Sequence, residues 1–179
     1  MPIQSKKDYL YYLEADLKAH GLTKWNLRER VLRPTLKFQR FMRYIEYINN
    51  CKNGLHWKLY LFILKALFIK KSVKFGFDIP INTFGPGLCL VHWGTIVVSA
   101  KAKIGSNCRI HPGTCIGERF GRSPVIGNDV YIGPGAKIYG EIWIGNKVDI
   151  GANSVINKNV PSNVVVAGVP GKIISEKIV

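Results

Sequence analysis

The sequence predicts a mainly β protein, a parallel β-helix preceded by an α-helical region. Two observations predict the β-helix: aliphatic residues recur every six positions, and glycine often follows them. A third observation, apolar residues at helical spacing before residue 75, predicts the helices. The aliphatic positions are Val98, Ile104, Ile110 and Ile116, then Ile126, Ile132, Ile138, Ile144, Ile150 and Ile156.

A period of six fits neither an α-helix nor a simple alternating strand. It is typical of short strands joined by corners, where one aliphatic side chain per side points inward and glycine permits the bend. Three sides make one coil of about 18 residues, and stacked coils bury their aliphatic columns against one another. An antiparallel sandwich is the alternative, but its turn signals recur about every 8 to 12 residues, whereas the period here is constantly six.

The chain has 179 residues, 47% of them hydrophobic, which is enough for one main domain and a small appendage. We expect a basic α-helical region over residues 1–75, a β-helix domain over 76–175 with an extruded loop at 117–125, and a tail over 176–179. The formal charge of +15 is uneven, since residues 1–75 carry +11 and the remainder +4.

The N-terminal region is expected to hold three helices. The first begins near Ser5, which forms a capping pattern with Asp8, and ends at Gly21. The second follows Pro34, and the third covers roughly residues 55–71. The expected apolar faces are Leu10, Leu13 and Leu17 in the first helix, and Phe38, Phe41, Ile45 and Ile48 in the second.

The third helix contains an apolar run over residues 59–69 that is broken only by Lys65. It is too short and too interrupted to span a bilayer. We favour burial against the β-helix or a neighbouring subunit; the alternative is peripheral contact with an anionic membrane, helped by Lys58, Lys70 and Lys71. Nucleic acid explains the charge less well, because no aromatic stacking platform or nucleic-acid motif accompanies it.

The four cysteines show no CxxC spacing, and no charged-then-apolar signal segment precedes the first helix. This favours a reducing, cytoplasmic location. Cys108 and Cys115 fall at coil positions where small residues pack, so we expect them in the core.

Candidate chemistry lies where the period of six fails. Six residues before Val98 stands His92, a polar residue where the period predicts an aliphatic one. Ile110 lies 18 residues, or one coil, after His92. His111 is therefore in the next coil, one residue past the position that stacks on His92. Neighbouring coils are about 4.8 Å apart, so the two histidines can share one side of the stack. We favour a catalytic role for His92, and for His111 a structural role is the stronger alternative.

The second failure of the period is the spacing of ten between Ile116 and Ile126. Four extra residues must bulge from the coil, giving a loop over 117–125. Such excursions often supply a wall of a site, although a tolerated insertion is the alternative. The loop carries Arg119, Arg122 and Ser123.

Four segments carry a resemblance to a known family: 85–98 with Gly-Pro-Gly-Leu and Val-His-Trp-Gly-Thr-Ile-Val-Val, 132–138, 150–156 and 165–173. With them, residues 75–175 resemble the hexapeptide-repeat acyltransferases, in particular the serine acetyltransferase branch. The resemblance implies a left-handed parallel β-helix, a homotrimer, acetyl-CoA as co-substrate with no metal, and an active site between subunits.

By this resemblance His92 is the general base that takes the proton of the acceptor hydroxyl, since histidine ordinarily titrates near neutral pH. The backbone of the flat coil edge is expected to bind the pantetheine arm, and two lysines the phosphates. The expected cofactor-binding residues are Gly133, Gly135, Ala136, Gly151, Ala152, Lys158 and Lys172. The expected acceptor-binding residues are Trp93, Arg119, Arg122 and Ser123.

The resemblance is weakest at the acceptor site. In serine acetyltransferases an Asp precedes the catalytic His and a second His follows an Arg in the loop; here these positions hold Val91 and Ser123. An acceptor ammonium group would lose an acidic partner, so a sugar hydroxyl is favoured over serine. The basic N-terminus and segment 79–88 also resemble acetyltransferases of capsular or exopolysaccharide units, which often work beside the cytoplasmic membrane.

Two other classes of function fit the sequence less well. Zinc-dependent carbonic anhydrases share this type of β-helix but need three histidines, and His20 and His56 lie in the helical part. A non-catalytic scaffold is disfavoured by His92 and by the segment 165–173.

Overall fold

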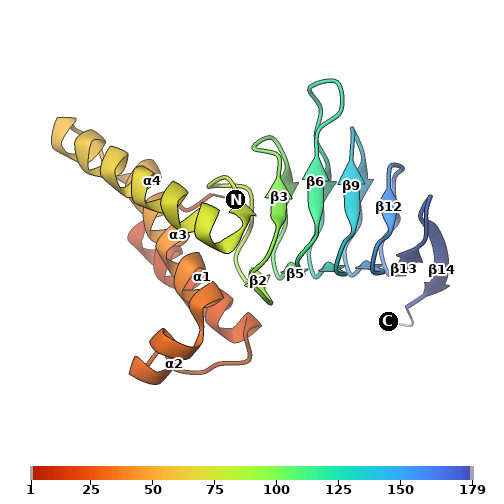
Figure 1. Cartoon of the computed structure of the whole chain (residues 1–179), viewed down its shortest axis with the longest axis horizontal. Coiled ribbons are helices and arrows are strands. Elements are labelled where there is room, and N and C mark those ends of the chain that lie inside the picture. The colour runs from red at the N-terminus through yellow and green to blue at the C-terminus, as the bar shows by residue number, and fades with distance from the viewer. Residues whose placement is uncertain (1, 178–179) are drawn as a thin grey trace.

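The computed structural model describes residues 2–177. Helices lie at one end of an elongated molecule, and a stack of coils runs from them to the other end (Figure 1). The parallel β-helix predicted from the period of six is confirmed, with three sheets of parallel strands and one antiparallel strand at the far end.

Four helices precede the coils, one more than the sequence predicted. Ser5 caps the first as expected, because its Oγ accepts a hydrogen bond of 3.0 Å from the Asp8 N–H. The helix that was missed has only six residues, which is too short for a periodic apolar pattern to be recognised in the sequence. The helices are α1 (Lys6–Ala19), α2 (Leu27–Leu32), α3 (Pro34–Cys51) and α4 (Leu55–Phe75).

The apolar faces predicted for α1 and α3 are mostly buried, and they pack the helices on one another. Leu10 is the exception: its side chain is 54% exposed, and Tyr12 is buried instead. Phe41 is only partly buried. The residues found in the core as predicted are Leu13, Leu17, Phe38, Ile45 and Ile48.

The coils are built from three sheets, which we name A, B and C in the order in which the chain visits them from β3 onward. Sheet A contains β1 (Phe77–Asp78), β3 (Ile96–Val98), β6 (Cys115–Gly117), β9 (Lys137–Tyr139) and β12 (Val155–Ile156). Sheet B contains β4 (Lys103–Ile104), β7 (Val125–Ile126) and β10 (Trp143–Ile144). Sheet C contains β2 (Cys89–Leu90), β5 (Arg109–Ile110), β8 (Tyr131–Ile132), β11 (Asp149–Ile150), β13 (Val164–Ala167) and β14 (Lys172–Glu176).

The predicted aliphatic column is the core of the stack, and all its members are at most 5% exposed. The register corrects one expectation. Leu90 pairs with Ile110, whereas Val98 pairs with Ile116, so two extra residues lie between Leu90 and Val98. His92 therefore occupies an enlarged, exposed corner and not an inward position of the period.

A ladder of side chains that the sequence analysis did not predict closes the corner between sheets B and C. The Oδ1 of Asn128 accepts a hydrogen bond of 2.8 Å from the Ser106 N–H, and the Oδ1 of Asn146 accepts one of 2.7 Å from the Asn128 N–H. The Oγ of Ser162 continues the ladder at the Asn146 N–H, 2.9 Å away. Each coil thus satisfies a corner N–H of the coil before it.

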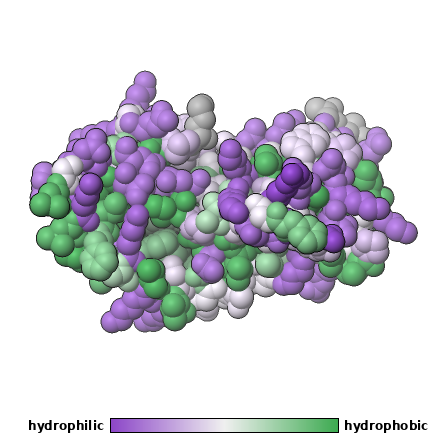
Figure 2. All heavy atoms as spheres, turned by 90° about the horizontal axis from the view of Figure 1, so that it is seen from above, coloured by the Kyte–Doolittle hydropathy of each residue, from purple (hydrophilic) through white to green (hydrophobic). Residues whose placement is uncertain are grey.

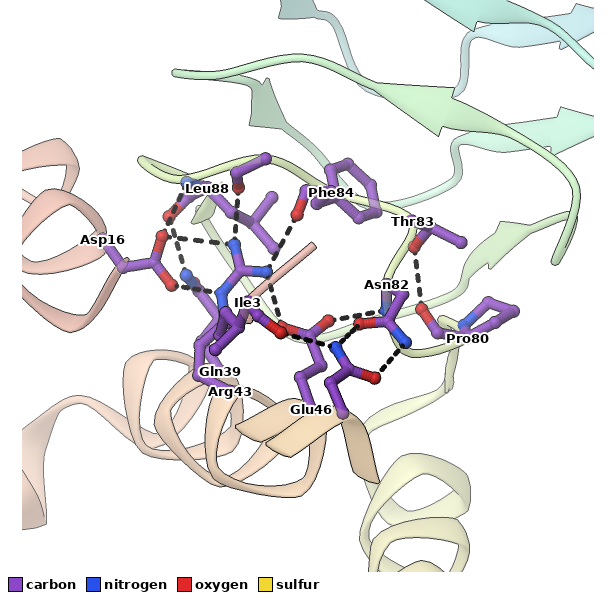
Figure 3. A network of polar contacts seen from close by, with 12 residues as sticks. Ile3, Asp16, Gln39, Arg43, Glu46, Pro80, Asn82, Thr83, Phe84 and Leu88 are labelled. Atoms are coloured by element: carbon purple, nitrogen blue, oxygen red, sulfur yellow. Dashed lines mark hydrogen bonds and ion pairs between the residues drawn. The ribbon is translucent and has the colours of Figure 1, made fainter. Parts of the chain in front are cut away.

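The first coil has no preceding coil to pair with, and side chains of α1 and α3 take that place (Figure 3). The Oδ1 of Asp16 accepts hydrogen bonds of 2.9 Å from the N–H groups of Gly87 and Leu88. Gln39 accepts one of 3.0 Å from the Leu90 N–H and donates one of 2.7 Å to the Leu88 carbonyl. The open edge of sheet C is thereby closed.

Arg43 lies at the centre of this contact and is fully buried. It donates to the carbonyls of Phe84 and Gly85, at 3.0 and 2.6 Å. It also forms ion pairs of 2.9 Å with Asp16 and 3.0 Å with Glu46. Burial alone lowers the pKa of Arg43, but the two carboxylates raise it above its usual range, so the guanidinium stays charged.

The far end of the stack is closed by β14, which turns back antiparallel on β13. Glu176 belongs to this strand, and Lys177 pairs with Asp149 at 2.6 Å, so these residues are not part of a separate tail. Residues 178–179 of the predicted tail lie outside the described part of the chain.

Helix α4 corrects part of a second expectation, because most of its apolar residues are exposed and not packed on the β-helix. Burial against a neighbouring subunit stays a prediction. Only Leu64, Phe68 and Ser72 are buried. Figure 2 shows hydrophobic and hydrophilic side chains interleaved over the helical end. None of the helices within residues 2–177 combines the length and apolar content that a membrane span requires.

The cysteines are all free thiols. Cys108 is buried in the core as predicted, and burial raises its pKa to about 12. Cys115 is only partly buried.

Replacing Arg43 with alanine is expected to lower the free energy of unfolding by about 3–5 kcal/mol, because Asp16 and Glu46 would remain buried without their partner. Urea denaturation followed by circular dichroism, at one protein concentration, measures this loss. The matched control is Lys18→Ala, which removes an exposed ion pair with Glu14 of 2.7 Å and should cost less than about 1 kcal/mol. Equal losses in the two variants would contradict a central role for the buried network.

Candidate active site

The first group of predicted site residues lies along one corner of the stack, where strands of sheet C lead into sheet A. We call it the C–A corner; its turns are residues 91–95, 111–114, 133–136 and 151–154. His92 and Trp93 occupy the first turn, and His111 the second. Lys172 adjoins the last turn, because the preceding Gly171 N–H donates to the Val155 carbonyl. The third and fourth turns hold Gly133, Gly135, Ala136, Gly151 and Ala152.

The two histidines come together as predicted. Val91 donates its N–H to the Ile110 carbonyl, which places His111 level with Val91 and one residue away from His92. The centres of the two imidazole rings are 6.3 Å apart. His92 is exposed, as is Trp93 beside it, whereas His111 is half-buried. A molecule in solvent therefore reaches His92 first.

Two contacts hold His111 in place. Its carbonyl accepts a hydrogen bond of 2.7 Å from the Thr114 hydroxyl, and its ring meets the Tyr131 ring edge-on at 5.2 Å. Its Nε2 atom is buried and has no hydrogen-bond partner within residues 2–177. Burial, with the positive charges of Arg109 and His92, lowers the pKa of His111 below its usual range. The ring is therefore neutral at neutral pH.

Close packing between neighbouring coils explains the glycines of this corner. A Cβ atom on Gly133 would lie 2.8 Å from the Ala152 nitrogen and from the Ile150 carbonyl oxygen. Gly135 has a φ of 76° and would collide with the Asn153 side chain of the next coil. Close stacking of coils requires glycine here, so the residue type by itself is not evidence for a ligand.

The loop over 117–125 lies at a different corner, between sheets A and B, which we call the A–B corner. Arg119 and Arg122 close it, each donating its N–H to the other's carbonyl, at 2.9 and 3.1 Å. Arg122 forms an ion pair with Glu141, and the Ser123 hydroxyl lies 2.9 Å from that of Ser99. The loop is thus held by contacts with the coil before it and the coil after it.

A cavity of about 460 Å³ adjoins the loop. Arg119 and Arg122 line it, together with three residues that the sequence analysis missed: Tyr139, Glu141 and Asn157. The coil count predicts their place, because 139–141 and 157 are the A–B corners of the following coils. Lys158 follows directly in that corner.

The predicted site residues thus fall into two groups. His92, His111 and most of the expected cofactor residues lie on the C–A corner, whereas the loop residues and Lys158 lie on the A–B corner. The two corners border opposite sides of sheet A, so one chain does not bring its loop to its own His92. No group of three or more His, Cys, Asp or Glu residues suited to a metal ion occurs within residues 2–177.

A family model described as bacterial transferase hexapeptide, six repeats, matches residues 123–158. Curated relatives include the serine acetyltransferase of Synechococcus elongatus, 38% identical over 94 residues, which are 50% of this chain and 38% of that protein. The serine acetyltransferase of Staphylococcus aureus is 41% identical over 96 residues, 51% of this chain and 45% of that protein. The chain spans less than half the length of these curated relatives.

Solved structures match over a greater length. The serine acetyltransferase of Brucella abortus strain S19 is 31% identical, with a TM-score of 0.77, over 96% of this chain and 70% of that one. A structure of serine acetyltransferase in complex with coenzyme A, also from Brucella abortus, is 30% identical with a TM-score of 0.76 and covers 97% and 70% of the two chains.

We expect His92→Gln to raise the pKa of His111, because it removes one of the charges that lower it. A pH titration of the imidazole C–H signals by NMR measures the shift. The pKa of His20, which burial lowers and to which His92 does not contribute, is the internal control. A His111 pKa that does not move would show that the two rings are not electrostatically coupled.

Proposed function

Because the chain belongs to the hexapeptide-repeat acyltransferases, in their serine acetyltransferase-like branch, we propose that it transfers acetyl from acetyl-CoA to a hydroxyl group, with His92 as the general base. The observation that carries the proposal is the C–A corner. There an exposed histidine stands beside a neutral one, at the head of a row of glycine-rich turns.

The chemistry follows from the weakness of an alcohol as a nucleophile at neutral pH. His92 takes the hydroxyl proton as the acceptor oxygen attacks the thioester carbonyl. The carbon–sulfur bond then breaks, and His92 returns the proton to the departing sulfur, so the products are an acetyl ester and free CoA thiol. His111 is neutral and adds no positive charge that would oppose protonation of His92.

The turns over 133–136 and 151–154 are the proposed seat of the pantetheine arm. They continue the line of the corner away from His92, so a thioester at His92 would have its chain along them. Lys172 stands at the end of this line and is the proposed partner of a CoA phosphate. Lys158 lies on the other corner and would reach the same cofactor only from a neighbouring subunit.

A homotrimer with the site between subunits is part of the proposal. Within one chain the His92 corner and the loop corner are separated by sheet A. Rotation about a three-fold axis sets the C–A corner of one copy beside the A–B corner of the next. Arg119, Arg122 and Ser123 of one subunit would then complete the site that His92 of another begins.

The acceptor has two candidates. Serine is supported by the name that the curated relatives and the solved structures share, and these comparisons favour it over the saccharide preferred from the sequence. A neutral saccharide hydroxyl is supported by the charges of the site. The four turns of the C–A corner contain no acidic residue. The loop acids Glu118 and Glu141 are already paired with Lys101 and Arg122.

His92→Ala is expected to lower kcat/KM by about 100- to 10,000-fold, the usual contribution of a general base. Thiol release from acetyl-CoA is measured with serine, nucleotide sugars and polysaccharide repeat units as separate acceptors. His56→Ala, an exposed histidine on α4, is the matched control and should keep full activity. Release with serine alone identifies a serine acetyltransferase, release with sugars alone a saccharide O-acetyltransferase, and no release with any acceptor would refute the proposed activity.

Mixed trimers test whether two subunits share one site. His92→Ala and the double variant Arg119→Ala/Arg122→Ala should each be inactive alone. Coexpressed, the two chains should recover about a quarter of the wild-type activity, the fraction of sites that join an intact His92 to an intact loop in random trimers. No recovery in trimers shown by mass spectrometry to be mixed would place each site within a single chain.

A further inference from the structure

Helix α4 has two apolar faces, and the protein covers only one of them. Leu64, Phe68 and Ser72 point into the fold and are buried. On the opposite side, residues spaced three and four apart form a second apolar row along the helix. This exposed row consists of Leu55, Leu59, Phe62, Ala66, Ile69 and Val73, and its large members are 62–84% exposed.

The charges on α4 are all positive. The helix carries five lysines and no acidic residue. Lys65 is hydrogen-bonded to Asn49 at 3.0 Å, and Lys71 lies over the Phe41 ring, 5.9 Å from its centre. None of the lysines of α4 forms an ion pair with another residue of the described chain. The helix therefore presents an apolar row with unneutralised positive charge beside it.

A basic cavity of about 520 Å³ lies where α2, the start of α3 and the end of α4 meet. Four cations line it, two of them from α4, and none has an acidic partner among residues 2–177. Apolar side chains, among them Val31 and Phe41, line the rest of its wall. The four cations are Arg30, Lys37, Lys71 and Lys74.

We propose that α4 docks this protein on an anionic phospholipid bilayer, lying in the plane of the interface. The exposed row enters the boundary of the acyl chains, and the lysines reach the headgroups through their flexible apolar stems. The basic cavity takes an anionic headgroup, because its cations match a phosphate and its apolar wall matches the start of an acyl chain.

The charges favour a bilayer over a second copy of the chain. Two copies of α4 packed along their exposed rows would bring lysines against lysines, with no acidic residue on either helix to compensate. An anionic surface instead attracts every one of these charges. The N-terminal end of α4 points away from the coils (Figure 1), whereas its C-terminal end adjoins the first turn of the C–A corner, where the Gly94 N–H donates to the Phe75 carbonyl at 3.0 Å.

The first experiment is flotation of the protein with two kinds of vesicle. One is phosphatidylcholine with about 30% phosphatidylglycerol, and the other is pure phosphatidylcholine. The protein should float with the anionic vesicles and remain largely unbound with the neutral ones, and raised salt should weaken the binding. The assay needs no acetyl transfer, so it stands apart from the proposed activity. Absence of the protein from the anionic vesicle fraction overturns the proposal.

Two pairs of variants locate the contact. Lys71→Gln/Lys74→Gln should weaken vesicle binding about 25-fold, since each basic residue near an anionic surface contributes about a factor of five. Its control, Lys103→Gln/Lys147→Gln, removes the same charge from the coils and should bind normally. Phe62→Ser should weaken binding at least about 10-fold, whereas Ile174→Ser, exposed on β14 at the other end, should not. Equal effects within either pair contradict docking through α4.

A fluorescent probe distinguishes lipid from a second copy. An environment-sensitive dye attached through a maleimide to Leu59→Cys, in a chain whose partly buried cysteines are replaced by serine, should shift to the blue when anionic vesicles are added. A blue shift that grows with protein concentration in the absence of vesicles would show that another copy covers the row, and it would overturn the proposal.

Discussion

The fold depends on how the first coil of the stack is closed. A β-helix exposes unpaired backbone groups at both ends, and here the N-terminal end meets protein. Arg43, Asp16 and Gln39 pair with the N–H and carbonyl groups of residues 84–90, all away from solvent. These contacts join the helices to the coils and set the start of the register that every later coil inherits. These three side chains are polar although buried, because their partners are backbone N–H and carbonyl groups that need hydrogen bonds.

Beyond the first coil, the number of residues per coil determines where the candidate site residues lie. Each coil places its corners above those of the previous coil, so residues about one coil apart in sequence become neighbours. Two irregularities bear on the site, two extra residues before Val98 and four in the loop over 117–125. They fall on different corners: the first makes room for His92 and Trp93 at an exposed turn, and the second builds a wall of Arg119 and Arg122. A site that uses both needs a neighbouring copy of the chain.

The helical region therefore has two separate faces with separate roles. Its inner face, formed by α1 and α3, closes the stack through buried polar contacts. Its outer face, formed by α4 and the basic cavity, carries exposed apolar residues and unpaired positive charge. Most of the positive charge of residues 1–75 lies on surfaces that do not contact the first coil. Arg43 differs, because its charge is buried in the contact that closes the first coil and is needed for the fold.

The sequence alone determined the β-helix, its inward column, the extruded loop and the pairing of His92 with His111, because a period of six leaves few ways to bury so many aliphatic residues. It also determined the helices that bury an apolar face, although not α2, which has only six residues. Tertiary structure decided the rest. Only the register shows that His92 stands at an enlarged corner, and only the packing shows that α4 buries one face, mainly against α3, and leaves the other exposed. Asp16, Gln39 and Arg43 look like ordinary surface residues in the sequence, since nothing local reveals that a polar side chain faces an open sheet edge more than forty residues away.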